Sequence, residues 1–506
     1  MEHTEQNKRI AKNSILLYVR MIFVMAVAFY SSRIILSTLG ITDYGIYNIV
    51  AGVITMLGFL TGALGNTASR YITFALGQGD IKKTEQIFNT ILILHLGMSF
   101  LILILGESIG LLLVHYKLVI PTDRFQAALW VYQCSIFTFI GSLMRVPYNA
   151  LIIAHERMNA YAYISVFEVS AKLGILFIIM KMPYDRLINY AIWLLLIQMV
   201  ILCIHIIYTH TAFKDVRHKA TINKKLFREI MEYIGWSSSG FLAIIGYGQG
   251  INVLLNLFFG PVANAAQGIT IQVQSAVNQF FTNFQMAVNP QITKSYASGN
   301  LPYMHQLIIF SSKYSFFMVW IVALPILFYT EEILKWWLGN IPTYTADFVR
   351  IMLLICMDAT LSGPCLTAIH ATGHIKKFQI IEASMLLCIV PVAYIGLKFF
   401  HLDATWVFLS YLIIELITQC ARMWIIFPEI GLRFSTYCKQ TLIPIGTTVI
   451  FSFIGTFGIN IGCEHFKINA ITSMILIGFT TLAITMITGI SPKERNYIRQ
   501  KIHFNF

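Results

Sequence analysis

The sequence predicts an all-α integral membrane protein, and three observations carry this prediction. Of its 506 residues, 57% are hydrophobic and only 12% are charged, whereas soluble proteins carry about 25% charged residues. Apolar runs as long as the roughly 20 residues that a helix needs to cross the hydrocarbon core recur along the whole chain. The polar breaks between these runs are too short to hold a soluble domain.

The apolar runs predict about fourteen transmembrane helices. The first run lacks the small-residue cleavage pattern of a signal peptide, so we interpret it as a retained helix. In chain order, the expected helices span residues 13–38, 43–68, 84–105, 124–146, 159–180, 186–209, 230–257, 262–289, 303–328, 344–369, 377–398, 403–427, 440–462 and 468–489.

Basic residues are distributed unevenly between the two sides of the membrane. If the N-terminus is inside, the Lys and Arg of cytoplasmic segments far outnumber those of external segments, and the longest basic connector, FKDVRHKATINKKLFREI at 213–230, is cytoplasmic. This positive-inside bias places both termini in the cytoplasm. It also accounts for most of the net charge of +13, so membrane lipids are the expected surroundings and nucleic acid is not an expected partner.

The basic connector separates two similar halves. Several identities share one offset of 220 residues, and two more share an offset of 217: Gly40 with Gly260, Ile72 with Ile292, Thr73 with Thr293, Gly79 with Gly299, Gln86 with Gln306, Pro147 with Pro364 and Ala154 with Ala371. Because six helices separate the copies, both halves insert with the same orientation. The sequence therefore predicts an N-terminal lobe (1–212), a connector (213–229), a C-terminal lobe (230–427), and two extra helices with a basic tail (428–506).

The polar turn LGITDYGIYNIV at 39–50 is expected to form the external hairpin of the first lobe. Gly40 is placed to end the first helix in a left-handed conformation. Asp43 is placed to cap the second helix, and Gly45 permits close contact between helices.

The run RIILSTLGITDYGIYNIVAGVITMLGFL, followed by ASRYITFALGQGD, resembles the polysaccharide-exporter branch of the multidrug/oligosaccharidyl-lipid/polysaccharide flippase superfamily, especially bacterial O-antigen and capsule repeat-unit flippases. Its sharpest motif is LGxxxYG at Leu39, Gly40, Tyr44 and Gly45. The resemblance implies a non-enzymatic flippase of the bacterial inner membrane that moves undecaprenyl-pyrophosphate-linked oligosaccharide by alternating access. It further implies a monomer working beside the polymerase and export machinery of its pathway. The two last helices are expected either to hold the prenyl tail or simply to face lipid.

Basic side chains inside the spans are the first functional candidates, because a charge at the membrane centre costs roughly 2.5–3.5 kcal/mol on insertion scales. Arg20, Arg70, Arg145 and Lys294 fall toward cytoplasmic helix ends, and Arg33 falls nearer the outside. The planar fork of arginine suits phosphate oxygens. We expect these five residues to form a substrate site with a cationic inner mouth, the alternative being that they reach out to lipid headgroups.

Acidic side chains are the second set of candidates. Glu168 and Lys172 stand four residues apart and are expected to pair, while Asp358, Glu415 and Glu382 lie within later spans. Buried carboxyls can carry a proton or bind sodium, so these residues are expected to couple transport to an ion gradient, unless they are structural pairs. The sequence contains no metal cluster or nucleotide-binding motif, and we expect no cofactor beyond H⁺ or Na⁺.

Two other functions stay open. A cation-coupled multidrug exporter of the same superfamily would be expected to direct acids at a cationic drug, and the excess of basic residues in the first lobe argues against it. A membrane polysaccharide polymerase or acyltransferase commonly needs a substantial external loop. The longest external breaks here, near 106–123 and 329–343, are short.

Overall fold

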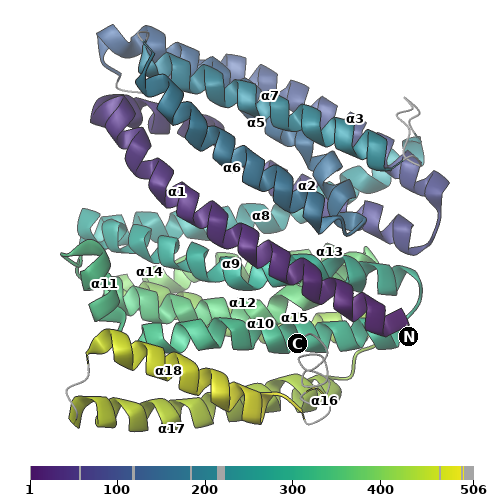
Figure 1. Cartoon of the computed structure of the whole chain (residues 1–506), viewed down its shortest axis with the longest axis vertical. Helices are drawn as coiled ribbons and strands as arrows, with labels where there is room; N and C mark the ends of the chain where they lie inside the picture. The colour runs from purple at the N-terminus through teal and green to yellow at the C-terminus, as the bar shows by residue number, and fades with distance from the viewer. Residues whose placement is uncertain are drawn as a thin grey trace. The chain divides into compact units, whose positions relative to one another are not determined.

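The computed structural model describes residues 2–55, 58–116, 120–182, 185–213, 223–465, 469–491 and 494. All regular structure in these ranges is helical (Figure 1). The α-helices are α1 (Glu2–Thr55), α2 (Gly58–Gly77), α3 (Ile81–Leu105), α4 (Leu111–Tyr116), α5 (Phe125–Ala154), α6 (Met158–Met180), α7 (Arg186–Ala212), α8 (Lys224–Phe259), α9 (Pro261–Ala297), α10 (Leu301–Phe328), α11 (Thr330–Leu338), α12 (Thr345–Thr372), α13 (Lys376–Leu387), α14 (Ile389–Phe399), α15 (Thr405–Ile430), α16 (Phe434–Tyr437), α17 (Ile443–His465) and α18 (Ala470–Ile484).

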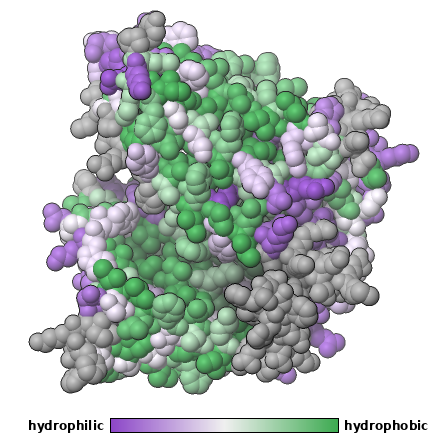
Figure 2. Space-filling model, viewed as in Figure 1, coloured by the Kyte–Doolittle hydropathy of each residue, from purple (hydrophilic) through white to green (hydrophobic). Residues whose placement is uncertain are grey.

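The predicted fold class, an all-helical membrane protein, is confirmed. Within the described ranges, all fourteen predicted spans fall on helical segments, with α13 and α14 together forming the eleventh. Eleven helical segments in the described part of the chain are both long and apolar enough to cross a membrane. Large apolar side chains also cover much of the face shown in Figure 2, as expected of a surface that contacts lipid rather than water.

The backbone supports the predicted internal repeat. Gly40 and Gly260 have φ angles of 77° and 74°, and Gly79 and Gly299 have φ angles of 72° and 75°. Each glycine adopts a positive φ that other residues rarely tolerate. The residues that follow the second pair behave alike too, since Asp80 caps α3 and Asn300 caps α10, each by accepting a bond from the amide three residues on.

The chain divides into two compact units, residues 1–241 and 242–506, which are here called unit 1 and unit 2. The division falls inside α8, after the predicted connector, and residues 214–222 of that connector lie outside the described ranges. We describe each unit by itself.

In unit 1, Arg124 joins three segments at the predicted external end. Its guanidinium binds Asp43 of α1 and, at 2.5 Å, Asp185, which precedes α7. Asp185 also caps α7 by accepting from the amides of Leu187 and Ile188. The sequence predicted Asp43 as a helix cap. In the structure its carboxylate instead forms an ion pair with Arg124. Burial raises the pKa of Asp185, but the bonds from Arg124 and the two amides outweigh it and hold that pKa below its usual value.

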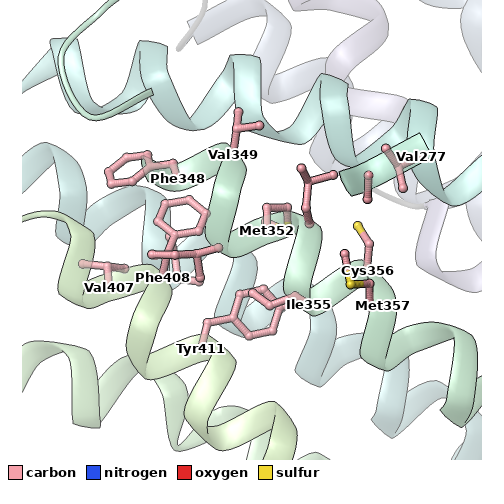
Figure 3. Close-up of a cluster of buried hydrophobic side chains, with 14 of the residues drawn as sticks. Val277, Phe348, Val349, Met352, Ile355, Cys356, Met357, Val407, Phe408 and Tyr411 are labelled. Carbon is pink, nitrogen blue, oxygen red and sulfur yellow. The ribbon is translucent and has the colours of Figure 1, made fainter. Parts of the chain in front are cut away.

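The contact between α12 and α15 is part of the core of unit 2. Figure 3 shows Phe348 of α12 beside Phe408 of α15, with ring centroids 4.2 Å apart. Tyr411 lies one turn beyond Phe408 in the same buried cluster. This aromatic packing fixes the rotation of α15 and therefore which of its polar residues face inward.

The extra pair α17 and α18 packs against α10 of unit 2. The Trp320 indole donates to Ser452 of α17 at 2.8 Å, and the Tyr329 hydroxyl donates to Asn460 at 2.7 Å. Glu494, after α18, binds the buried ammonium of Lys313 at 2.8 Å. The two last helices are therefore built into unit 2 through specific polar contacts.

Candidate functional site: two charge clusters of opposite sign

Unit 2 gathers three carboxyl groups around one arginine. Arg422 of α15 donates from Nε to Glu382 of α13 at 2.7 Å and from Nη1 to Glu415 at 2.7 Å. Its Nη1 also lies 3.8 Å from Asp358 of α12. We call Asp358, Glu382, Glu415 and Arg422 the acid cluster. The three acids expected from the sequence to couple to ions thus lie together.

The helical repeat explains how α15 supplies its share. Glu415, Gln419 and Arg422 follow at spacings of four and three, which place them on one helix face. That face is the buried one, since these three side chains are only 8%, 5% and 5% exposed. Aromatic packing at Phe408 holds the same face toward α12.

The acid cluster is not balanced in charge. If all three carboxyls were ionised, the single guanidinium would leave an excess of two negative charges in a site that water scarcely reaches. A buried environment of low dielectric constant strongly disfavours such an excess. The Oδ2 atom of Asp358 is also buried without a hydrogen-bond partner among the described residues. The arrangement therefore calls for added positive charge, from a proton or a small cation.

A tyrosine pair adjoins this cluster. The hydroxyls of Tyr247 in α8 and Tyr411 in α15 lie 2.9 Å apart, and Tyr411 precedes Glu415 by one turn. The sequence reasoning missed both tyrosines and Arg422. Arg422 left a signal, because a charged residue seven positions after Glu415 within a predicted span lies on the same helix face.

Unit 1 holds a cluster of the opposite sign. The predicted pair of Glu168 and Lys172 on α6 is present at 2.6 Å. Arg145 of α5, predicted instead as a substrate residue, binds the other oxygen of Glu168 at 2.6 Å. Arg145, Glu168 and Lys172, here called the basic cluster, therefore carry an excess of one positive charge.

The same face of α6 also receives Arg20 of α1. Its Nη1 donates to Ser165 at 3.2 Å, and its guanidinium carbon lies 4.8 Å from the ring centroid of Tyr161. Tyr161, Ser165, Glu168 and Lys172 recur at helical spacing. Two of the predicted substrate arginines, Arg20 and Arg145, thus lie along one face of α6.

The other predicted substrate residues lie elsewhere. Arg70 of α2 is held by aromatic faces, with its guanidinium carbon 4.3 Å from the ring centroid of Tyr71 and 5.0 Å from that of Tyr233. Lys294 is near the end of α9 in unit 2. Arg33 belongs to α1, but its side chain is outside the described residues.

Comparison with known proteins gives the fold. No protein-family model and no curated protein matches the sequence. Among solved structures, a crystal structure of a MATE point mutant matches with a TM-score of 0.73 and 14% identity, over 83% of this chain and 96% of the other. An outward-facing multidrug resistance MATE family transporter of the MOP superfamily matches with a TM-score of 0.72 and 15% identity, over 84% and 96%.

A third similar structure is a MOP superfamily transporter from Pyrococcus furiosus, described by a reversed polarity of its binding pocket, with a TM-score of 0.68 and 15% identity over 83% and 96% of the two chains. At these identities the likeness establishes the architecture. The chain has the fold of MOP superfamily transporters.

Proposed function

We propose that this protein is a MOP superfamily transporter of the bacterial inner membrane that translocates lipid-linked oligosaccharide by alternating access, driven by protons. One observation carries the proposal. The basic cluster has an excess of positive charge suited to an anion such as pyrophosphate, while the acid cluster has an excess of negative charge suited to a coupling cation. Anionic cargo and coupling cation then have separate sites on the chain.

The composition of α9 supports a sugar-bearing cargo. This helix carries ten Asn and Gln residues between Pro261 and Ala297, whereas the corresponding segment of unit 1, residues 41–77, carries two. Amide side chains offer both donors and acceptors to sugar hydroxyls without adding charge. A helix rich in amide side chains, with Lys294 as its one charged residue, fits an oligosaccharide better than an apolar drug.

The coupling cation is assigned as a proton. The three carboxyls of the acid cluster surround Arg422, and a proton shared among them would reduce the excess negative charge without requiring a coordination shell. Glu168 is already paired with two cations, so it has less need of a proton.

A multidrug exporter is the second candidate, and the acid cluster is the observation in its favour, since buried carboxylates also attract cationic drugs. The solved structures of this fold include a multidrug resistance transporter and one described by reversed pocket polarity. The fold alone therefore leaves the charge of the cargo open, and the side chains must decide it.

The test is flipping by the purified protein in proteoliposomes. A fluorescent polyprenyl-pyrophosphate oligosaccharide should become accessible across the bilayer faster with an imposed pH gradient than without one. A cationic dye such as ethidium, followed in the same vesicles, should not be transported. Dye transport without oligosaccharide movement would replace the proposal by the multidrug alternative, and polymer formation would indicate an enzyme.

A variant pair sharpens this test of the basic cluster. Arg145→Gln combined with Lys172→Gln removes both cations, and the triple variant that adds Glu168→Gln avoids leaving a buried carboxylate unpaired. Oligosaccharide flipping should be lost in the triple variant although the protein folds. Normal flipping by that variant would remove the basic cluster from the cargo site.

A further inference from the structure

An apolar groove of about 650 Å³ lies on unit 2 beside α15 and the segment that follows it. Its lining includes Cys420, Met423, Trp424, Pro428, Leu432 and Phe434. Trp424 is 78% exposed and Phe434 is 56% exposed, so large apolar side chains edge an open hollow. In a membrane-spanning chain such a hollow faces hydrocarbon rather than water.

The groove is long and its ends differ. The deep end is at the buried Gln419, and the last lining residue on α15 is Pro428, so the groove follows the helix for about 14 Å at 1.5 Å per residue. At the other end, the lining residues Leu432 and Phe434 flank Arg433, and Lys439 precedes the lining residue Leu442. Both basic side chains are exposed. This end is the one that the distribution of Lys and Arg places at the cytoplasmic surface.

The two basic side chains at this end, Arg433 and Lys439, are available to bind an anionic group. Neither Arg433 nor Lys439 makes a side-chain ion pair or hydrogen bond with a described residue, whereas the nearby carboxylate of Glu429 is bonded to His374 at 2.9 Å. An apolar track with unpaired cations at its cytoplasmic mouth matches a lipid that has long chains and a negative headgroup.

We propose that this groove is a binding site for an anionic glycerophospholipid, with its chains along α15 and its phosphate at Arg433 and Lys439. The site has a link to the acid cluster, because Gln419 lines the deep end of the groove and its Oε1 accepts from Arg422 at 3.4 Å. The inference depends on the membrane fold and not on the identity of the transported cargo.

Trp424 makes the site measurable. The protein is reconstituted with dibrominated phosphatidylglycerol or, separately, with dibrominated phosphatidylcholine, because bromine quenches indole fluorescence on contact. The chain has eight tryptophans, so the signal of Trp424 is taken as the difference between the wild type and Trp424→Phe. We expect stronger quenching of Trp424 by the anionic lipid at equal bromine content.

Charge variants identify the headgroup contact. Each basic residue near an anionic membrane surface contributes about 1 kcal/mol of attraction, which corresponds to about a fivefold change in affinity. Removing Arg433 or Lys439 should therefore weaken the preference for phosphatidylglycerol about fivefold. The double variant Arg433→Ala, Lys439→Ala should quench equally with both lipids. The control Lys82→Ala, Lys83→Ala removes the same net charge from unit 1 and should keep the preference.

Three results would overturn the proposal. The first is equal quenching of the wild type by the two lipids. The second is a preference for phosphatidylglycerol that survives the Arg433 and Lys439 double variant. The third is relief of quenching by added polyprenyl phosphate but not by unbrominated phosphatidylglycerol, which would assign the groove to a different lipid.

Discussion

The two units share a backbone plan but place their charges differently. With the repeat offset of 217, the positions equivalent to the acid cluster of unit 2 are neutral in unit 1 or carry only a histidine. Asp358 corresponds to Gly141, Glu382 to Ser165, Glu415 to Gln198 and Arg422 to His205. In reverse, the basic cluster residues Arg145, Glu168 and Lys172 correspond to Ser362, Met385 and Ile389.

The difference shows which features the repeat conserves. Glycines with positive φ and the caps after them recur in both units because the chain reversals need them. The charged side chains of the two clusters do not recur, since a buried charge must be matched by a local partner and each unit makes its own set. The repeat therefore preserves the backbone turns, while the described cluster of unit 1 has an excess of positive charge and that of unit 2 an excess of negative charge.

The largest expected effect is on the stability of unit 2. Arg422→Ala would leave three buried acids without their shared cation, which costs about 3–5 kcal/mol for a broken buried pair. The matched change in unit 1, Arg145→Ala, should cost less because Glu168 keeps Lys172. Thermal unfolding in detergent compares the two, and equal melting temperatures would contradict the different electrostatics of the clusters.

The second prediction separates the clusters by function. Asp358→Asn should abolish stimulation of flipping by a pH gradient, because Asp358 is the acid of this cluster whose Oδ2 is buried without a hydrogen-bond partner among the described residues. Glu168→Gln should retain the stimulation, because its carboxylate is engaged by two cations. The assay is flipping in proteoliposomes with and without the gradient. The reverse outcome would move the coupling site to Glu168 of unit 1, which the sequence also offered as an ion-coupling candidate.

The third prediction concerns the helix contact at the repeated prolines. In unit 2, Pro364 leaves the Thr360 carbonyl without its helical partner, and the Gln285 amide lies 3.4 Å from it. Gly363 makes room, since a Cβ there would lie 2.3 Å from Oε1 of Gln285. The Gln285 amide is buried and also donates to the Ser315 hydroxyl, so it cannot move away without losing these contacts. Gly363→Ala should therefore cost about 1–3 kcal/mol, as overpacking does.

Unit 1 supplies the control for this contact. At the repeat offsets of 220 and 217, Gln285 corresponds to Gly65 and Gly363 corresponds to Val146. In unit 1 the glycine of this contact is therefore on α2, whereas in unit 2 it is on α12. A Cβ at Gly65 would lie 3.7 Å from Cγ1 of Val146, an ordinary contact. Gly65→Ala should leave the melting temperature nearly unchanged, and a large loss there would show that the two contacts are packed alike.

The smallest effect is the acid sensitivity of unit 1. Because the pKa of Asp185 is held below its unfolded value, its stabilising contribution is complete above the unfolded pKa of about 3.9 and is lost as the pH falls through the folded pKa. The melting temperature of Asp185→Asn should therefore be lower than that of the wild type near neutral pH. The difference should shrink as the medium becomes strongly acidic, and a constant difference would indicate that the carboxylate charge contributes little.

The sequence by itself determined the spans, their order, the internal repeat and the glycine turns, because these depend on local composition, periodicity and backbone freedom. It also indicated most of the charged candidates, since any charge within an apolar run is conspicuous, and it predicted the pair of Glu168 and Lys172 from their spacing. The grouping was decided only by the tertiary structure. Glu382 meets Arg422 across forty residues, and Arg20 meets Ser165 across 145. Such partners depend on how each helix is rotated, which distant packing such as that of Phe348 against Phe408 sets.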